Sequence, residues 1–460
     1  MLVEKISSSD PLVIAEASVA LRKALSQDRN PPIAEVLATG ILPRLRELLS
    51  DFTRPSVQLE TCWSLTNIAS GTPDQTKAVV DCGVVPIFVE LLKCSNPPLQ
   101  EQALWALANI AGDRAEYRDG CISVGTVEAL ATIMDTSLRN RSTQMSRLAA
   151  WGLSNLCRGR PQPVFNKLQP CLPPLARALS LSNDSEVLAD SAWALSYLTD
   201  TTDGSTMKTI VSQFDVKRIV SLLGHPSSSV HIPVLRAVGN LVAGQSEITR
   251  LVVEAGALNL FKSLVSSNKK SVRKETLWAV SNVCADSDTL VRSVIDCGLM
   301  DRICDIVRDG HADQDVRKEA VWSICNACTV GKQVDVASLV TDRRYRILDL
   351  LCEYLDACRD TQSMKTVLDS IYAILSIYEN DPDGLNPFCV VVEECGGLAT
   401  IEALQQDESA DVYNAAVRIL ESFFDCNEDI VSPGPLNFDF GRPAQTKREG
   451  MPILPFARSG

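Results

Sequence analysis

The sequence predicts an all-α protein, a right-handed superhelical solenoid built from about ten helical repeats. Three observations support this fold. The tryptophans recur at a nearly constant interval, the apolar residues around them have helical spacing, and glycines punctuate the shorter helical segments between them. A single repeat of this kind cannot bury its own apolar faces, so stacking of neighbours is needed for a continuous core.

The tryptophans define the repeat. All six follow one another at intervals of 42 to 46 residues, apart from one double interval of 85 residues that has Arg236 near its midpoint. They are Trp63, Trp105, Trp151, Trp193, Trp278 and Trp322. A period of 40–47 residues is typical of armadillo and HEAT arrays. We therefore expect about ten armadillo repeats, the first and last without the tryptophan.

Each repeat contains three predicted helices. A long helix carries the tryptophan, as in residues 100–110, where apolar residues recur at helical spacing. A shorter helix ends at a glycine such as Gly83 or Gly298, which supplies a left-handed cap. A third helix starts with proline in some repeats (Pro43, Pro86) and ends at a Leu-Leu pair. We expect the solenoid to span residues 1–430 and a flexible, Pro/Gly-punctuated tail to span residues 431–460.

Composition restricts the function. With 44 basic and 57 acidic residues the chain carries a formal charge of −13. This charge disfavours direct nucleic-acid binding and favours cationic partners. No apolar run of about 18 residues indicates a membrane span, and 16 cysteines in 460 residues are too few for a disulfide framework. We therefore expect a soluble protein of the cytosol or nucleus.

An enzyme is not expected. The sequence has three histidines and no phosphate-binding glycine loop or nucleophile elbow. The Cys325/Cys328 pair lacks a second pair of zinc ligands. The acidic stretch 309–315 lacks the glycine and glutamate of a calcium loop. We expect no cofactor and no metal.

An asparagine follows most of the tryptophans four residues later, on the same helix face. The pairs are Trp63/Asn67, Trp105/Asn109, Trp151/Asn155, Trp278/Asn282 and Trp322/Asn326. One such pair could be core filler beside a chance asparagine, but asparagine is a poor helix former and here it recurs. Its amide can bind both the N–H and the C=O of an extended peptide. Neighbouring indoles would hold Lys or Arg stems, with cation–π attraction.

Acidic residues keep a constant phase relative to these pairs. Asp113 lies one turn after Asn109, and Asp190, Glu275 and Glu319 lie three residues before their tryptophans. We expect these acids to meet the cationic ends of a bound peptide. The pattern is interrupted at Tyr197, where asparagine is expected, and at Arg236. The interruption predicts two peptide sites.

At these residues the sequence resembles the importin-α (karyopherin-α) family of nuclear import adaptors. The resemblance rests on the strings Trp-Ser-Leu-Thr-Asn-Ile-Ala-Ser-Gly-Thr (63–72), Trp-Ala-Leu-Ala-Asn-Ile-Ala-Gly-Asp (105–113) and Trp-Gly-Leu-Ser-Asn-Leu-Cys-Arg (151–158). It covers nearly the whole solenoid. It implies a protein that binds lysine/arginine-rich nuclear localisation signals as extended peptides in an acidic concave surface, and that shuttles between cytoplasm and nucleus.

The resemblance also implies site residues. The major site, in repeats 2–4, would comprise Trp63, Asn67, Ser70, Gly71, Thr76, Gln102, Trp105, Asn109, Asp113, Trp151 and Asn155. Of these, Ser70, Gly71, Thr76 and Asp113 would form the pocket for the critical lysine. A linker region at Asp190, Trp193 and Tyr197 would separate it from a minor site in repeats 6–8. The minor site would comprise Arg236, Asn240, Glu275, Trp278, Asn282, Glu319, Trp322 and Asn326.

Three departures from the family pattern modify these expectations. Leu148 stands where the family has a polar asparagine, and Ser246 stands where an acid is expected in the minor site. The family also begins with a basic segment that binds importin-β and folds back onto the peptide site, whereas this sequence starts directly in the first repeat. Either this sequence is shorter than the whole protein or the protein lacks this segment. If the protein lacks it, we expect constitutive cargo binding, with importin-β recruited differently or not at all. The resemblance also implies a recycling exportin, and we expect a monomer.

The alternative is an armadillo scaffold of the catenin kind. That interpretation predicts a basic surface for acidic partners and no Trp/Asn pairs. Both the negative charge and the recurring pairs argue against it.

Overall fold

The computed structural model describes residues 2–378 and 386–424. All regular secondary structure in these two stretches is helical, which confirms the predicted all-α class. The chain divides into two compact units, Met1–Leu260 and Phe261–Gly460. The predicted tail at 431–460 lies outside the described residues.

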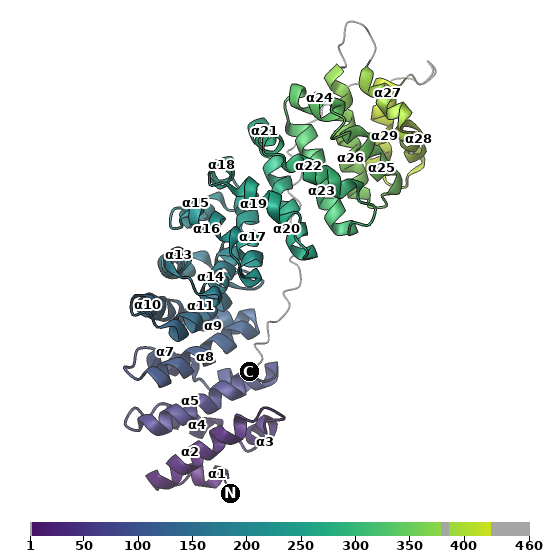
Figure 1. Cartoon of the computed structure of the whole chain (residues 1–460). Coiled ribbons are helices and arrows are strands. Elements are labelled where there is room, and N and C mark those ends of the chain that lie inside the picture. Colours follow the sequence, from purple (N-terminus) through teal and green to yellow (C-terminus); the bar gives the residue numbers. More distant parts are fainter. Residues whose placement is uncertain (1, 379–385, 425–460) are drawn as a thin grey trace. The chain divides into compact units, whose positions relative to one another are not determined.

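The first unit contains eighteen complete α-helices, which follow one another in layers (Figure 1). They are α1 (Leu2–Ile6), α2 (Pro11–Leu25), α3 (Ile33–Ala38), α4 (Leu42–Leu49), α5 (Pro55–Ala69), α6 (Pro73–Asp81), α7 (Val85–Leu91), α8 (Pro97–Asp113), α9 (Ala115–Ser123), α10 (Thr126–Arg139), α11 (Thr143–Cys157), α12 (Phe165–Leu168), α13 (Leu172–Leu181), α14 (Ser185–Leu198), α15 (Gly204–Val211), α16 (Val216–Ser221), α17 (Ser228–Val242) and α18 (Ser246–Glu254). Two 3₁₀ turns, η1 (Gln169–Cys171) and η2 (Leu222–Gly224), belong to the same unit.

Helix α19 (Ala257–Leu264) crosses the boundary between the units in sequence. The described residues of the second unit form α20 (Lys270–Cys284), α21 (Asp288–Asp296), α22 (Leu299–Arg308), α23 (Gln314–Val330), α24 (Gln333–Thr341), α25 (Ile347–Ala357), α26 (Thr361–Leu375), α27 (Pro387–Glu394), α28 (Gly397–Ala403) and α29 (Ala410–Phe423). The turns η3 (Ser376–Tyr378) and η4 (Leu404–Gln406) complete it.

Every third helix, from α2 to α29, is 14–17 residues long. We call these the inner helices. Ten of them lie in the described part of the chain, which confirms about ten repeats. All six tryptophans lie on inner helices, and two shorter helices separate each inner helix from the next.

The expected sharp turn between the two shorter helices is present in each unit. In the first, α6 ends at Asp81 and Gly83 takes a φ of 78° before α7 begins. In the second, Gly298 takes a φ of 69° between α21 and α22. L-residues rarely adopt this left-handed conformation, which explains glycine at these positions. The predicted proline in the first turn of the following helix is also present in α7.

Within each unit, consecutive inner helices pack against each other. In the first unit α5 contacts α8, and α8 contacts α11. The buried residues of α8 include Leu99, Leu104, Leu107 and Ile110. Because these residues leave only one narrow face free, the side chain of Trp105 is directed to solvent at 39% exposure.

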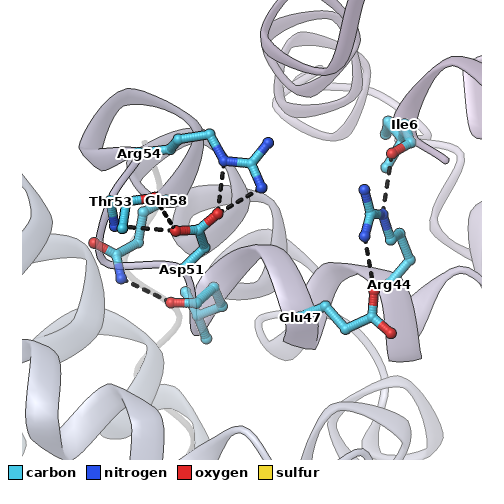
Figure 2. A network of polar contacts seen from close by, with 8 residues as sticks. Ile6, Arg44, Glu47, Asp51, Thr53, Arg54 and Gln58 are labelled. Atoms are coloured by element: carbon cyan, nitrogen blue, oxygen red, sulfur yellow. Dashed lines mark hydrogen bonds and ion pairs between the residues drawn. The ribbon is translucent and has the colours of Figure 1, made fainter. Parts of the chain in front are cut away.

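Polar contacts join the first layers (Figure 2). The buried amide of Gln58 in α5 donates to the carbonyl of Leu49 at the end of α4, at 2.8 Å. Arg44 in α4 reaches back to the carbonyl of Ile6 at 3.2 Å. Between α4 and α5, hydrogen bonds from Thr53 and Arg54 lower the pKa of Asp51 to about 2. The connection therefore keeps a charged carboxylate at neutral pH.

No single helix within 2–378 and 386–424 is long and apolar enough to cross a bilayer, and one bent pair, α9 with α10, meets the length and composition criteria together.

Candidate functional site

The tryptophan and asparagine side chains that lie four residues apart on the inner helices form a series that we call the Trp/Asn ladder. In the first unit its most exposed tryptophans are Trp63 on α5 and Trp105 on α8, which are 36% and 39% exposed. Trp151 on α11 is half-buried. Single exposed apolar side chains are common, whereas exposed apolar side chains that lie together mark interaction surfaces. Two exposed indoles on adjacent, packed helices therefore indicate a binding surface.

A cation already lies on one of these indoles. The guanidinium of Arg22, from the preceding inner helix α2, lies 4.8 Å from the ring centroid of Trp63. Its Nε also donates to Glu60 at 2.7 Å. The ring face of Trp63 is thus oriented so that it can take a cation, as the cation–π hypothesis requires.

The ladder asparagines do not all have the same role. The amide nitrogen of Asn155 donates to the carbonyl of Ala108 in α8 at 3.0 Å, and that of Asn67 donates to Ser26 Oγ at 2.9 Å. The amide nitrogen of Asn109 is buried and has no hydrogen-bond partner among the described residues. Buried donors are rarely left unpaired. Asn155 therefore links neighbouring repeats, whereas the amide nitrogen of Asn109 makes no such link.

The segment after α5 is fixed by its own hydrogen bonds. A Cβ on Gly71 would lie 2.0 Å from Gln75 Oε1, which accepts from the backbone N–H of Thr72 at 2.9 Å. Thr76 is buried, and its hydroxyl donates to the carbonyl of Ala69 at 3.0 Å. Ser70 is exposed. Of the predicted lysine-pocket residues in this segment, Ser70 can touch a ligand, whereas Thr76 positions the loop.

Asp113 closes the same stretch of the ladder, at the end of α8. Its side chain is 15% exposed, and its carboxylate accepts a hydrogen bond from Arg114 Nε at 2.9 Å. Gln102, one turn before Trp105 on α8, is buried, and its carbonyl accepts from Thr66 Oγ1 at 3.2 Å. An acidic group therefore lies at the end of the helix that carries Trp105, and its partner Arg114 was not predicted from the sequence.

The predicted interruption is a stacked aromatic pair. The rings of Trp193 and Tyr197 on α14 lie 5.8 Å apart at 21°. Burial raises the pKa of the Tyr197 hydroxyl, and the nearby charges of Arg158 and Arg236 act against that rise. The negative charge of Asp190 adds to the rise of the Tyr197 pKa. Two guanidinium groups and one carboxylate therefore lie near Tyr197, where the ladder is interrupted.

The predicted minor-site residues fall in both units. Arg236 and Asn240 lie on α17 in the first unit, where the Asn240 amide nitrogen donates to the carbonyl of Ser196 at 2.9 Å. In the second unit, Asn326 on α23 donates to the carbonyl of Ser281 on α20 at 2.9 Å. These contacts repeat the inter-repeat link of Asn155.

The second unit also contains a ladder asparagine with an unpaired amide nitrogen. The amide nitrogen of Asn282, four residues after Trp278 on α20, is buried without a hydrogen-bond partner in the described part of the chain. Trp322 on α23 donates from its ring nitrogen to Ser363 Oγ at 3.3 Å, and the Lys318 ammonium lies 5.4 Å from its ring centroid. Its indole is therefore held in place by α26.

The predicted site acids of the second unit are largely covered by neighbouring side chains. Glu275 and Glu319 are buried, with 4% and 9% of their surface exposed. Asp286 was not predicted from the sequence, and one of its carboxylate oxygens is buried without a partner among the described residues. Asp286 follows Asn282 by four residues, the same spacing that separates Asp113 from Asn109. That repeated spacing was the signal that could have identified it.

The other residues singled out in the sequence have structural roles. Asp313 caps the start of α23 and pairs with Lys270 at 2.7 Å. Cys325 and Cys328 are buried within α23. In residues 2–378 and 386–424 no group of three His, Cys, Asp or Glu side chains could hold a metal ion. Leu148 is buried in α11, so its side chain packs in the core.

Comparisons with known proteins agree with this architecture. The armadillo/beta-catenin-like repeat model matches residues 29–70, 72–112, 169–200 and 245–285, and the atypical Arm repeat model matches residues 386–435. The crystal structure of an engineered protein matches with a TM-score of 0.78 and 26% sequence identity, covering 92% of this chain and 97% of that one.

Curated relatives match over almost the full chain. Importin subunit alpha-1b from rice, Oryza sativa subsp. japonica, is 38% identical over 449 residues, which cover 96% of this chain and 82% of that protein. Importin subunit alpha-3 from Arabidopsis thaliana is 41% identical over 429 residues, which cover 92% of this chain and 79% of that protein.

Proposed function

This chain belongs to the importin-α family, and from that premise we propose that it is a nuclear import adaptor that binds lysine/arginine-rich nuclear localisation signals as extended peptides along the Trp/Asn ladder. The major site comprises the ladder residues of repeats 2–4 and the minor site those of repeats 6–8. The protein acts as a monomer that moves between cytoplasm and nucleus, with importin-β and a recycling exportin as further partners.

One observation carries the proposal. The unpaired amide nitrogen of Asn109 lies on the same helix face as the exposed indole of Trp105, one turn away. An extended peptide pairs with no strand, so its backbone groups need partners, and the half-buried side-chain amide of Asn109 carries both a donor and an acceptor. The indoles of Trp63 and Trp105 offer flat apolar faces for the methylene stems of lysine or arginine on either side of that donor.

Charge supports the same ligand. The net charge of −13 attracts a cationic peptide over long range. At short range the Asp113 carboxylate lies one turn beyond Asn109 on the same helix. Neither feature suits an acidic partner, which disfavours the scaffold alternative.

The test is a fluorescence-anisotropy titration of a labelled, lysine-rich extended peptide against the intact chain and a Trp105→Ala/Asn109→Ala variant. We expect the intact chain to bind with a Kd of about micromolar or tighter and the variant to lose at least about tenfold in affinity. Phe52→Ala is the matched control, because Phe52 is an exposed aromatic that lies between α4 and α5, off the inner helices.

A second peptide with every lysine replaced by glutamine controls for nonspecific binding. Equal affinity for both peptides, or equal affinity of the intact chain and the ladder variant, would contradict the proposal. Absence of binding by the intact chain would favour the armadillo scaffold alternative over the import adaptor.

A further inference from the structure

An arginine of this chain occupies the acidic end of the proposed major site. Helix α8 ends at Asp113, and the backbone of Arg114 is extended, with φ −152° and ψ 162°. The chain therefore leaves the helical path between these two residues. The change of direction lets the Arg114 side chain fold back, so that its Nε lies 2.9 Å from Asp113 Oδ2.

A second contact holds the same guanidinium. It lies 4.9 Å from the ring centroid of Tyr117, in the first turn of α9. The hydrogen bond to Asp113 raises the pKa of Arg114, so the group is a permanent cation. Asp113 is 15% exposed, whereas Arg114 is 39% exposed. The carboxylate is thus covered by a cation that is itself open to solvent and can move away.

We propose that Arg114 is a specificity-determining residue of the major site: it pairs with Asp113 while no peptide is bound, and a peptide lysine must displace it to reach that carboxylate. The inference rests on the proposed function, since it concerns the same ligand and the same acid. Because Tyr117 keeps the displaced guanidinium close by, Arg114 continues to repel the incoming ammonium. Arg114 therefore weakens binding at this position and makes the chain depend more strongly on the peptide's other contacts.

The experiment compares the wild-type chain with Arg114→Gln, Asp113→Asn and the double variant, using the same labelled lysine-rich peptide. We expect Arg114→Gln to tighten binding about two- to fivefold, the range that an exposed charge pair accounts for. The gain should become smaller when Asp113 is already Asn, because no carboxylate is then released and only the repulsion by Arg114 is removed. Arg114→Lys keeps the charge and should stay close to wild type.

A series of peptides identifies the lysine whose binding Arg114 affects. Each lysine in turn is replaced by norleucine, which keeps the stem and removes the charge. We expect the gain from Arg114→Gln to disappear for one member of the series, the one whose lysine pairs with Asp113. A gain that is uniform over the series would overturn the proposal, since it would reflect the overall charge alone.

The chain offers a matched control for the charge change. Arg344 pairs with Asp342 at 2.7 Å and lies 5.0 Å from the ring centroid of Tyr345, an equivalent arrangement outside the Trp/Asn ladder. Arg344→Gln should leave the affinity unchanged. Thermal unfolding of each variant verifies that the fold is retained.

The outcomes separate this inference from the proposed function. If the wild-type chain binds the peptide and the Trp105→Ala/Asn109→Ala variant does not, the proposed function stands. Unchanged or weaker binding by Arg114→Gln would then overturn the role of Arg114 alone. If neither the wild-type chain nor any variant binds the peptide, the proposed function itself is contradicted.

Discussion

At the residue scale, the ladder asparagines separate into two groups with opposite consequences for stability and binding. Asn155 is 6% exposed and holds a carbonyl of the preceding repeat, whereas Asn109 carries a buried amide nitrogen without a partner in the described residues. An intramolecular hydrogen bond contributes about 1 kcal/mol to stability, and a buried donor left unpaired reduces it. An asparagine at this position of the repeat therefore either joins neighbouring repeats or leaves its amide nitrogen unpaired.

This division predicts different outcomes for two identical substitutions. Asn155→Ala should lower the free energy of unfolding by about 1 kcal/mol, because it removes the bond to Ala108. Asn109→Ala should leave the unfolding midpoint nearly unchanged and weaken peptide binding about fivefold, the equivalent of one hydrogen bond. Urea unfolding and peptide titration of both variants measure the two effects. A larger loss of stability for Asn109→Ala than for Asn155→Ala would refute the division.

Three cysteines at equivalent places give a second prediction at this scale. Cys82, Cys297 and Cys395 each precede a left-handed glycine, are half-buried, and donate to the carbonyl three residues earlier. Burial raises the pKa of Cys82 and of Cys297. A hydrogen bond with the Cys352 thiol instead lowers the pKa of Cys395. Of the three thiols, Cys395 therefore has the largest thiolate fraction at neutral pH.

We expect Cys395 to react with iodoacetamide about fivefold faster than the other two at pH 7, since the thiolate is the reactive form. The difference should shrink as the pH rises, because Cys82 and Cys297 then ionise as well. Peptide mapping by mass spectrometry measures the rates. Cys352→Ala should slow Cys395 to the rate of Cys82, and a variant that leaves the rate of Cys395 unchanged would disprove the assigned cause.

At the element scale, glycine has two distinct roles in these repeats. Gly40 connects α3 and α4 with a φ of 69°, and a Cβ there would meet no atom within 4 Å. Gly120 lies inside α9, outside the left-handed region, and a Cβ there would also meet nothing within 4 Å. Because neither position is crowded, only the backbone conformation distinguishes them.

Alanine at the two positions should therefore change stability in opposite directions. Gly120→Ala should raise the free energy of unfolding by about 0.5–1 kcal/mol, since helical glycine is entropically unfavourable. Gly40→Ala should lower it by about 1 kcal/mol, because alanine is strained at positive φ. The shift of the urea midpoint, followed by circular dichroism, tests both. Changes of the same sign would show that local packing, not φ, decides the outcome.

The sequence predicted the helices well because their signals are local and repeated. Tryptophan spacing, glycine caps and first-turn prolines recur, and the structure has an inner helix at each expected position. The ladder residues of α5, α8 and α11 are also on the inner helices that the spacing predicted.

Contacts that depend on helix ends and on neighbouring repeats could not be predicted. Sequence neighbours such as Asp113 and Arg114 point apart on a continuous helix, and they meet here only because α8 ends between them. The bond from Asn155 to Ala108 joins residues 47 positions apart. The buried state of Glu319 likewise depends on the packing of several helices, which a one-helix pattern does not reveal.

At the scale of the whole molecule, the proposed function assigns the approach of a peptide to the net charge of −13 and its retention to the ladder. Long-range attraction is screened by salt, with a Debye length of about 10 Å at 0.1 M and about 3 Å at 1 M. Contacts between indoles and lysine stems are apolar and much less sensitive to salt. The salt dependence of binding therefore separates the two contributions.

We expect the affinity for a lysine-rich peptide to fall roughly tenfold between 0.05 and 0.5 M KCl, as about three exposed ion pairs of about 0.5 kcal/mol each are screened. The same peptide with acetylated lysines should bind more weakly at low salt, and its affinity should change by less than about twofold over this range, because its charges are gone and its stems remain. Anisotropy titrations at five salt concentrations provide both slopes. Equal slopes for the two peptides would mean that the acidic balance of the chain has no part in recognition, and the ladder would then have to account for the whole affinity through apolar and hydrogen-bond contacts.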